Sequence, residues 1–196
     1  HKGKKYYAFP FKKDSLAKKT DFYDEEGKAL RTMFLKAPLD YFRISSKFSP
    51  KRFHPVQRTW KAHKGTDYAA AHGTPIKTTA AGVVERTGYT AGNGNFVKVK
   101  HNGTYSTQYL HMSKILVRQG QRVSQGQVIG KVGSTGLATG PHVCYRFWKN
   151  GVQVDPLSQK FPNTEPMNAK HKPRFMEQMA PLKKELDSIA TVVFKQ

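Results

Sequence analysis

The chain has 196 residues, of which 37% are hydrophobic and 12% aromatic, and this apolar content excludes a wholly disordered chain. Lys and Arg number 34 against 13 Asp and Glu, a formal net charge of +21. We therefore expect an anionic polymer as partner, and charge alone does not choose among nucleic acid, anionic lipid and an anionic cell envelope. No apolar run reaches the roughly 18–20 residues of a membrane-spanning helix, and the single cysteine, Cys144, excludes a disulfide within the chain.

Residues 1–41 predict an N-terminal β arm, either laid on the core or left from a preceding domain. Aromatic segments at 6–11 and 21–24 are followed by a turn at 25–27 and a further apolar segment at 29–35, a pattern that favours a hairpin. The many lysines of this arm are typical of a solvated face.

Residues 42–162 predict an antiparallel all-β domain. Glycines are dense in this region, and short alternating segments such as 82–86, 96–100 and 105–110 lie between them. After Pro162 the composition changes. Apolar residues recur every three or four positions between 173 and 190, so the C-terminal extension, 163–196, predicts an amphipathic helix that packs on another part of the chain.

Side chains that can bind a metal are spread over several segments of the middle domain. His63, Asp67, His111, His142 and Cys144 offer imidazole, carboxylate and thiolate, the ligand types that zinc prefers. On a strand the side-chain period is two, so His142 and Cys144 are expected on one face. Each residue taken singly is weak support, because a lone histidine is usually structural or a surface residue.

Together these segments resemble the LytM/lysostaphin family of zinc metallopeptidases over roughly residues 42–158. The resemblance implies a compact antiparallel β-sheet domain with a groove across it and a single zinc ion at the groove floor. It is carried by the following runs in this order: Ser45–Phe48, Arg52–Pro55, His63–Ala70, Gly73–Ile76, Gly94–Val97, Tyr109–His111, Gly126–Gly130, Gly133–Gly136 and Thr139–His142.

Position by position, His63 and Asp67 match the first two zinc ligands of that family, and His111 and His142 match its two active-site histidines that are not ligands. The third ligand in the family is usually the second histidine of a His-x-His pair, and here Cys144 stands in that place. A set of histidine, carboxylate and thiolate is still chemically reasonable for Zn²⁺, so we expect His63, Asp67 and Cys144 to bind it.

The resemblance implies a zinc endopeptidase that cuts the peptides of bacterial peptidoglycan, located in the cell envelope, periplasmic or extracellular. Because the chain begins at His1, we also expect that an upstream secretion signal or a regulatory domain or protein belongs to the system. The main alternative is a LytM-like module with weakened catalysis that regulates other wall hydrolases. A nucleic-acid binder rests on charge and aromatic content alone, and a biotinyl-type carrier only on the Gly-Gln turns; neither has a supporting motif.

Overall fold

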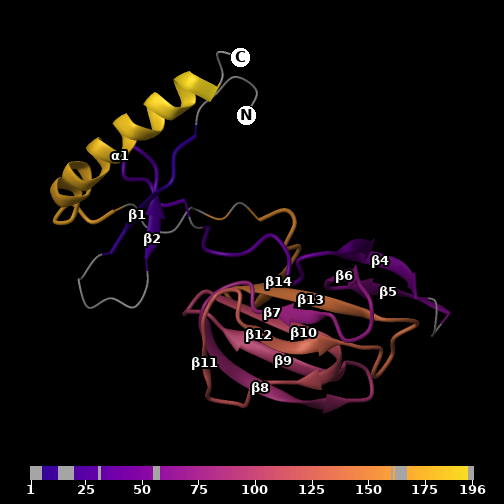
Figure 1. Ribbon diagram of the computed structural model, residues 1–196. Coiled ribbons are helices and arrows are strands. Elements are labelled where there is room, and N and C mark those ends of the chain that lie inside the picture. The colour runs from indigo at the N-terminus through magenta and orange to yellow at the C-terminus, as the bar shows by residue number, and fades with distance from the viewer. Residues whose placement is uncertain are drawn as a thin grey trace. The chain divides into compact units, whose positions relative to one another are not determined.

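The computed structural model describes residues 6–12, 20–30, 32–54, 58–159, 161 and 167–193, without the side chains of Arg52, His54 and 190–193. It forms two compact units, one from residues 1–33 with 161–196 and the other from residues 34–160. Figure 1 shows the elements of both units. Among the described residues, no helix is both long enough and apolar enough to cross a membrane.

In the first unit, the helix α1 (Lys172–Val193) packs on a two-stranded sheet of β1 (Phe9–Phe11) and β2 (Asp21–Tyr23). Phe9 and Phe11 point inward on either side of the exposed Pro10, as a strand's period of two requires. One turn of helix apart, Phe175 and Met179 complete a buried cluster with them and with Tyr23. The predicted amphipathic helix therefore buries its apolar face against the N-terminal arm.

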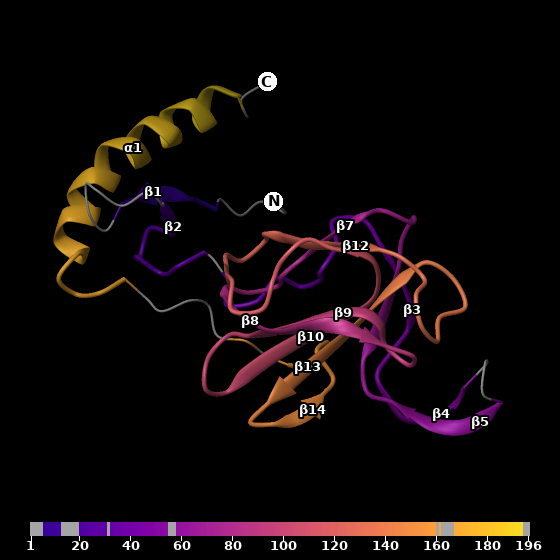
Figure 2. The same cartoon turned by 90° about the horizontal axis from the view of Figure 1, so that it is seen from below.

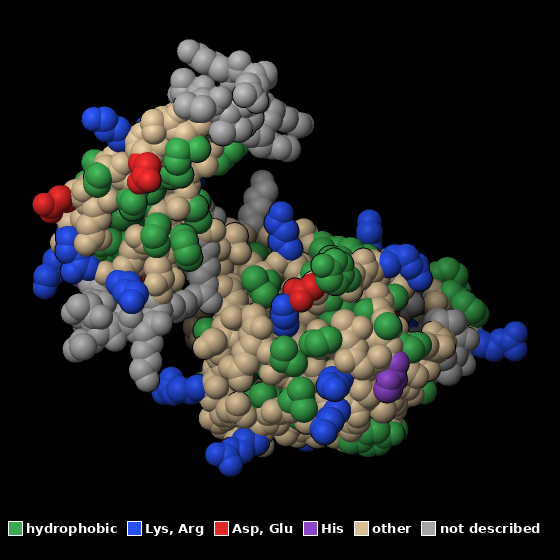
Figure 3. Space-filling view, in the orientation of Figure 1, with side chains coloured by type: hydrophobic (Ala, Val, Ile, Leu, Met, Phe, Trp, Pro, Cys, Tyr) green, Lys and Arg blue, Asp and Glu red, His purple; other side chains and the backbone are tan. Residues whose placement is uncertain are grey.

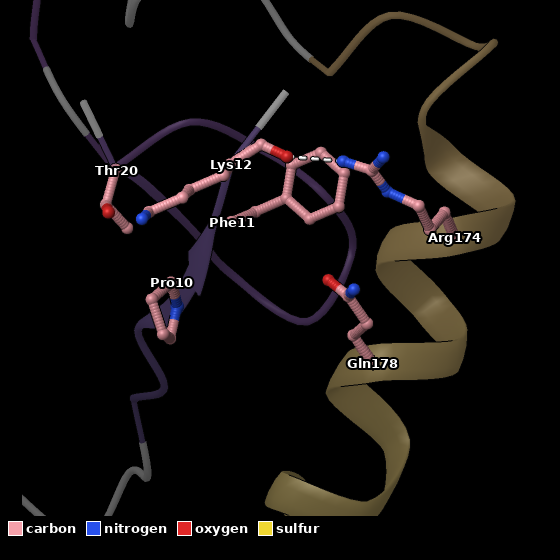
Figure 4. A pocket seen from close by; sticks show the side chains of 6 residues that line it. All are labelled: Pro10, Phe11, Lys12, Thr20, Arg174 and Gln178. Atoms are coloured by element: carbon pink, nitrogen blue, oxygen red, sulfur yellow. Dashed lines mark hydrogen bonds between the residues drawn. The ribbon is translucent and has the colours of Figure 1, made fainter. Parts of the chain in front are cut away.

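At the edge of this cluster, Arg174 joins the helix to the arm (Figure 4). Its guanidinium lies 4.7 Å from the centre of the Phe11 ring and donates a hydrogen bond to the carbonyl of Lys12. The turn that the sequence predicts at residues 25–27 is present, with Gly27 at φ +80°. The apolar segment at 29–35 forms no strand among its described residues, 29, 30 and 32–35: Ala29 makes an isolated bridge to Tyr23, and β2 pairs with β1.

The second unit is a ten-stranded antiparallel sheet with a separate hairpin (Figure 2). The hairpin joins β4 (Ser49–His54) to β5 (Thr59–His63). The main path of the sheet runs in the order β11 (Arg122–Val123), β8 (Gly82–Thr90), β9 (Gly94–Lys100), β10 (Tyr105–Ile115), β13 (His142–Lys149), β6 (Thr66–Ala69) and β3 (Arg43–Ser46). Off this path lie β12 (Val128–Val132), β7 (Pro75–Lys77) and β14 (Val152–Val154). The predicted mainly β fold with a C-terminal helix is confirmed, and the boundaries predicted at residues 41 and 162 remain predictions.

The two faces of this sheet differ in character. Val143, Tyr145 and Phe147 of β13 are almost completely buried on the core side. Beneath them, Thr79 connects two strands, because its hydroxyl lies 3.1 Å from the hydroxyl of Tyr109 and 2.9 Å from that of Tyr145. The alternate positions of β13 face the other way, and they carry the chemically active side chains.

The long strand β10 changes partner at an irregularity. Its first half pairs with β13 and β9, and after the register shift between Tyr109 and Met112 its second half pairs with β12. His111 lies in this bulge with φ +63°, in the left-handed region that few residues other than glycine occupy.

Lys and Arg side chains are spread over the visible surface with few acidic ones between them (Figure 3).

We expect Phe175→Ala to destabilise the first unit by about 3–5 kcal/mol, because it removes a fully buried ring from the cluster. Hydrogen exchange of the α1 amides measures this loss. The neighbouring Met176, which is 39% exposed, provides the matched control. Met176→Ala should cost less than about 1 kcal/mol, and an equal effect of the two changes would contradict this account of the packing.

Candidate active site

Three potential ligands from three strands converge at one point of the second unit. His63 is the last residue of β5, Asp67 lies in β6, and Cys144 lies in β13 directly opposite Asp67 in the antiparallel register. His63 Nε2 is 3.0 Å from Asp67 Oδ1 and 3.6 Å from Cys144 Sγ. Within the part of the chain that the structure describes, this is the set of three His, Cys, Asp or Glu side chains whose ligand atoms all lie within 4.8 Å of one another.

Gly65 allows this close approach. A Cβ atom at this position would lie 2.9 Å from Cys144 Sγ and 3.1 Å from the carbonyl oxygen of Tyr145. The contact with Cys144 Sγ is shorter than real Cβ atoms show and the other is tighter than most, so a side chain here would push β13 away from His63 and Asp67. The glycine of the His-x-Gly-x-Asp run is thus required by the packing of the site.

His111 and His142 lie next to these three residues. Their ring centroids are 4.7 Å apart, and His142 Nε2 is 3.9 Å from Asp67 Oδ1. His142 and Cys144 share a face of β13, as the strand period predicts. The structure therefore brings all five predicted site residues together.

A shared hydrogen-bond pattern orients the three histidine rings. Nδ1 lies 3.0 Å from the carbonyl oxygen of Lys47 in His63, 2.8 Å from that of Thr135 in His111, and 2.8 Å from that of Gly140 in His142. A carbonyl oxygen can only accept, so Nδ1 must carry the hydrogen in each ring. In the neutral imidazole, Nε2 then holds the lone pair that can bind a metal or accept a proton.

Two tight loops hold His111 in its unusual backbone conformation. The His111 amide donates to the carbonyl of Asn93, and the Thr135 hydroxyl donates to the carbonyl of Met112. Gly94 (φ +61°) and Gly136 (φ +73°) approach so closely that a Cβ on Gly136 would meet the Gly94 nitrogen at 2.2 Å. Only glycine fits where these loops cross, and the crossing fixes Thr135 under the His111 ring.

Burial and neighbouring charges set the protonation states in the site. Burial lowers the pKa of His111 to about 4, so its ring is neutral near pH 7. Burial alone would raise the pKa of Asp67, but the hydrogen bond and charge of His63, together with the charge of His142 and the hydrogen bond of Cys144, lower this pKa overall. Burial raises the pKa of the Cys144 thiol, and the nearby Asp67 charge raises it further. The site is thus a carboxylate, a buried sulfur and imidazoles turned toward one another.

Comparison with known proteins shows the family to which this chain belongs. The model of peptidase family M23 matches residues 61–156. The catalytic domain of the M23 protein EnpA from Enterococcus faecalis is 35% identical, with a TM-score of 0.53, and the match covers 61% of this chain and 94% of that domain. The chain belongs to peptidase family M23. The family resemblance predicted from the sequence is confirmed.

Two relatives from Vibrio cholerae extend this M23 match. The peptidoglycan DD-endopeptidase ShyC is 46% identical over 156 residues, which cover 80% of this chain and 36% of the relative. A crystal structure described as a zinc-containing peptidase is 38% identical with a TM-score of 0.63, and the match covers 80% of this chain and 47% of that one. The M23 chain thus spans about a third of the length of its curated relative ShyC.

The donor set of this M23 chain fits a zinc ion. Imidazole nitrogen, carboxylate oxygen and thiolate sulfur are the protein ligands of zinc, and three of them with a remaining open position form a catalytic site. The M23 assignment and the zinc-containing relative both point to a metal at this site.

Two further residues near this site, Gln108 and Arg146, were not predicted from the sequence. Arg146 follows Cys144 by two positions on β13, and strand alternation could have placed it on the same face. The remaining histidines were expected to be structural or surface residues. His72 is exposed and His171 contacts the Phe11 ring, while the side chain of His54 lies outside the described residues.

His101 has a structural role away from the site. Its Nδ1 lies 2.9 Å from the carbonyl oxygen of Ala81, and its Nε2 lies 2.8 Å from the Thr107 hydroxyl. Its ring also meets the edge of Phe34, with centroids 5.1 Å apart. Burial lowers the pKa of His101 to about 4 from the usual 6.5.

We expect His101 to make the second unit sensitive to acid. Because its pKa is lower in the folded than in the unfolded chain, its contribution to stability is present above pH 6.5 and is lost as the pH falls toward 4. His101→Gln, which keeps polar groups at this position, should reduce the loss of unfolding free energy between these pH values, measured by urea denaturation. The exposed His72→Gln is the control, and equal pH profiles for His101→Gln and the unsubstituted chain would refute the assignment.

Proposed function

We propose that this chain is the peptidase part of a zinc-dependent endopeptidase that hydrolyses peptide bonds of bacterial peptidoglycan. One observation carries the proposal: His63, Asp67 and Cys144 converge within 4.8 Å, beside two histidines whose Nε2 atoms are left as acceptors. Three ligands with adjacent acid–base groups are what metal-assisted amide hydrolysis requires.

In this proposal His63, Asp67 and Cys144 hold the metal. When bound, zinc supplies acidification of a water molecule and polarisation of the scissile carbonyl group. Asp67 is ionised because its pKa is lowered, so its negative charge is available without a proton having to leave first. The Nδ1 hydrogen bond of His63 to the Lys47 carbonyl keeps the ring turned toward Asp67.

His111 and His142 move the protons. A neutral ring whose Nδ1 donates to a carbonyl can accept a proton from water at Nε2, and it can then deliver that proton to the departing amine. The low pKa of His111 keeps its ring in the accepting form near pH 7. In both rings Nδ1 donates to a backbone carbonyl, so His111 and His142 share the acid–base work.

The relatives and the charge support peptidoglycan as the substrate. ShyC and ShyA, 46% and 41% identical to this chain, are both named peptidoglycan DD-endopeptidases. The net charge of +21 suits an anionic wall polymer, because a cationic surface raises the local concentration of such a substrate. On this proposal the chain acts in the cell envelope, outside the cytoplasm.

The substitution of cysteine for the family's usual third histidine favours a second candidate, a weakened module that regulates other wall hydrolases. A thiolate together with Asp67 would neutralise the dication, whereas two histidines and one aspartate leave one positive charge. The metal would then be less electrophilic. Turnover by the purified chain separates the two candidates.

Digestion of purified peptidoglycan tests the function directly. We expect the purified protein to release fragments with new free amines and no new reducing sugar ends. A chelator should abolish the release, and added zinc should restore it. New reducing ends, or activity that a chelator leaves intact, would refute a metal-dependent peptidase. Zinc binding without any digestion would favour the regulatory module.

His63→Ala and His111→Ala should separate metal binding from proton transfer. His63→Ala removes a ligand, so we expect bound zinc after dialysis to fall well below one ion per chain. His111→Ala should retain zinc and lower kcat by about 10²–10⁴-fold, the usual contribution of a general acid–base group. Metal analysis and wall digestion on the same samples measure both effects. Equal zinc loss in the two variants would overturn this division of roles.

Cys144 distinguishes this chain from the usual family pattern, and its substitution tests the third ligand. Cys144→Ser should lose most of the metal, because a neutral hydroxyl is a poor zinc ligand. Cys144→His restores the usual residue type, so it should retain zinc and digest peptidoglycan faster than the unsubstituted chain. Full zinc occupancy in Cys144→Ser would show that another group is the third ligand.

A further inference from the structure

A cavity of about 480 Å³ opens on the sheet that also carries the candidate metal centre. Phe96 connects the two places, because it lines this cavity and packs in one buried cluster with Leu110 and Cys144. The residues around the cavity come mainly from β8, β9, β10 and β13, and they are Glu85, Arg86, Thr90, Asn93, Phe96, Lys98, Gln108, Gln119 and Trp148.

The strand registers place this cavity on the face of the sheet that carries Cys144. Cys144, Arg146 and Trp148 alternate along β13 with the core residues, so all three face the same way. Gln108 of β10 lies opposite Arg146 on one side and opposite Lys98 of β9 on the other. The cavity and Cys144 therefore lie on the same face of the sheet.

Gln108 is an unusual residue for this position. Only 7% of its surface is exposed, and its side chain lines the cavity. On the neighbouring strand, the Nε of Arg146 is buried and has no hydrogen-bond partner among the described residues. The Gln108 amide is therefore available to a group that enters the cavity from outside the chain.

The charge around Gln108 selects the kind of group. Arg86 and Lys98 face one acidic residue, Glu85, whose carboxylate lies 2.8 Å from Lys98 Nζ. Arg146, across from Gln108 on β13, does not line the cavity. Lys98 Nζ also lies 5.2 Å from the centre of the Trp148 ring, which holds the ammonium over the cavity wall. The excess of positive charge with an amide donor fits a carboxylate.

We propose that this cavity, the Gln108 pocket, is a specificity subsite that binds a free carboxylate of the peptide substrate. The inference rests on the proposed peptidase function and extends it. A carboxylate in the pocket accepts from the Gln108 amide and is attracted by Arg86 and Lys98, so the scissile bond is set at a fixed distance from the metal centre. Peptides whose carboxylates are amidated lose these contacts and are poor substrates.

A matched pair of soluble peptides tests the pocket. One is a cross-linked peptidoglycan peptide with free carboxylates, and the other is the same peptide with those carboxylates amidated. We expect the unsubstituted protein to prefer the acidic peptide by at least about tenfold in kcat/KM, mainly through KM. Gln108→Leu should reduce this preference several-fold. Lys98→Gln should reduce it further, because Glu85 then faces the carboxylate without its partner.

Lys131→Gln is the matched control, since Lys131 is an exposed cation on β12 that does not line the pocket. It should leave the preference unchanged. If the unsubstituted protein shows no preference, or if Gln108→Leu and Lys98→Gln leave it as large as in Lys131→Gln, the proposal is overturned.

Binding of the same two peptides, measured by equilibrium dialysis, separates this proposal from the proposed function. If neither peptide is cut, the peptidase proposal fails. The subsite still stands when the acidic peptide binds more tightly than the amidated one and Lys98→Gln removes the difference. Equal binding of the two peptides overturns the subsite, whatever the outcome for catalysis.

Discussion

The antiparallel register between β6 and β13 is the constraint on which the candidate site depends. It sets Cys144 directly opposite Asp67, and it leaves His142 one strand period away on the same face. A shift of one residue would turn Cys144 and His142 into the core and bring Val143 and Tyr145 to the site. The hydroxyl of Tyr145, bonded to Thr79 below the sheet, opposes such a shift because the bond would be lost.

The second requirement of the site is a fixed direction for each imidazole. In each of the three rings, Nδ1 is held by a backbone carbonyl. His63 bonds to that of Lys47, His111 to that of Thr135 and His142 to that of Gly140. His111 needs more than this, since its φ of +63° costs on the order of 1–3 kcal/mol unless the surroundings impose it. The crossing of the loops at Gly94 and Gly136 imposes it, so these two glycines help to determine where the His111 ring lies.

One face of the sheet stabilises the domain while the other carries its chemistry. The core face is closed by apolar residues and by hydroxyl groups that bond to one another, as between Tyr109 and Thr107 at 2.9 Å. The opposite face keeps buried polar groups, Gln108 among them, that a core would not tolerate.

The sequence by itself determined what depends on local pattern and order. Short alternating segments between glycines indicated the antiparallel sheet, the three- and four-residue spacing between 173 and 190 indicated the helix, and the ordered motifs indicated the family and the five site residues. The period of two already placed His142 and Cys144 together. The tertiary structure alone decided which strands pair, that helix α1 packs on β1 and β2, and that Gln108 lies buried beside Arg146. These features depend on residues distant in the chain, whose contacts are set by strand register and by a bulge that no local pattern encodes.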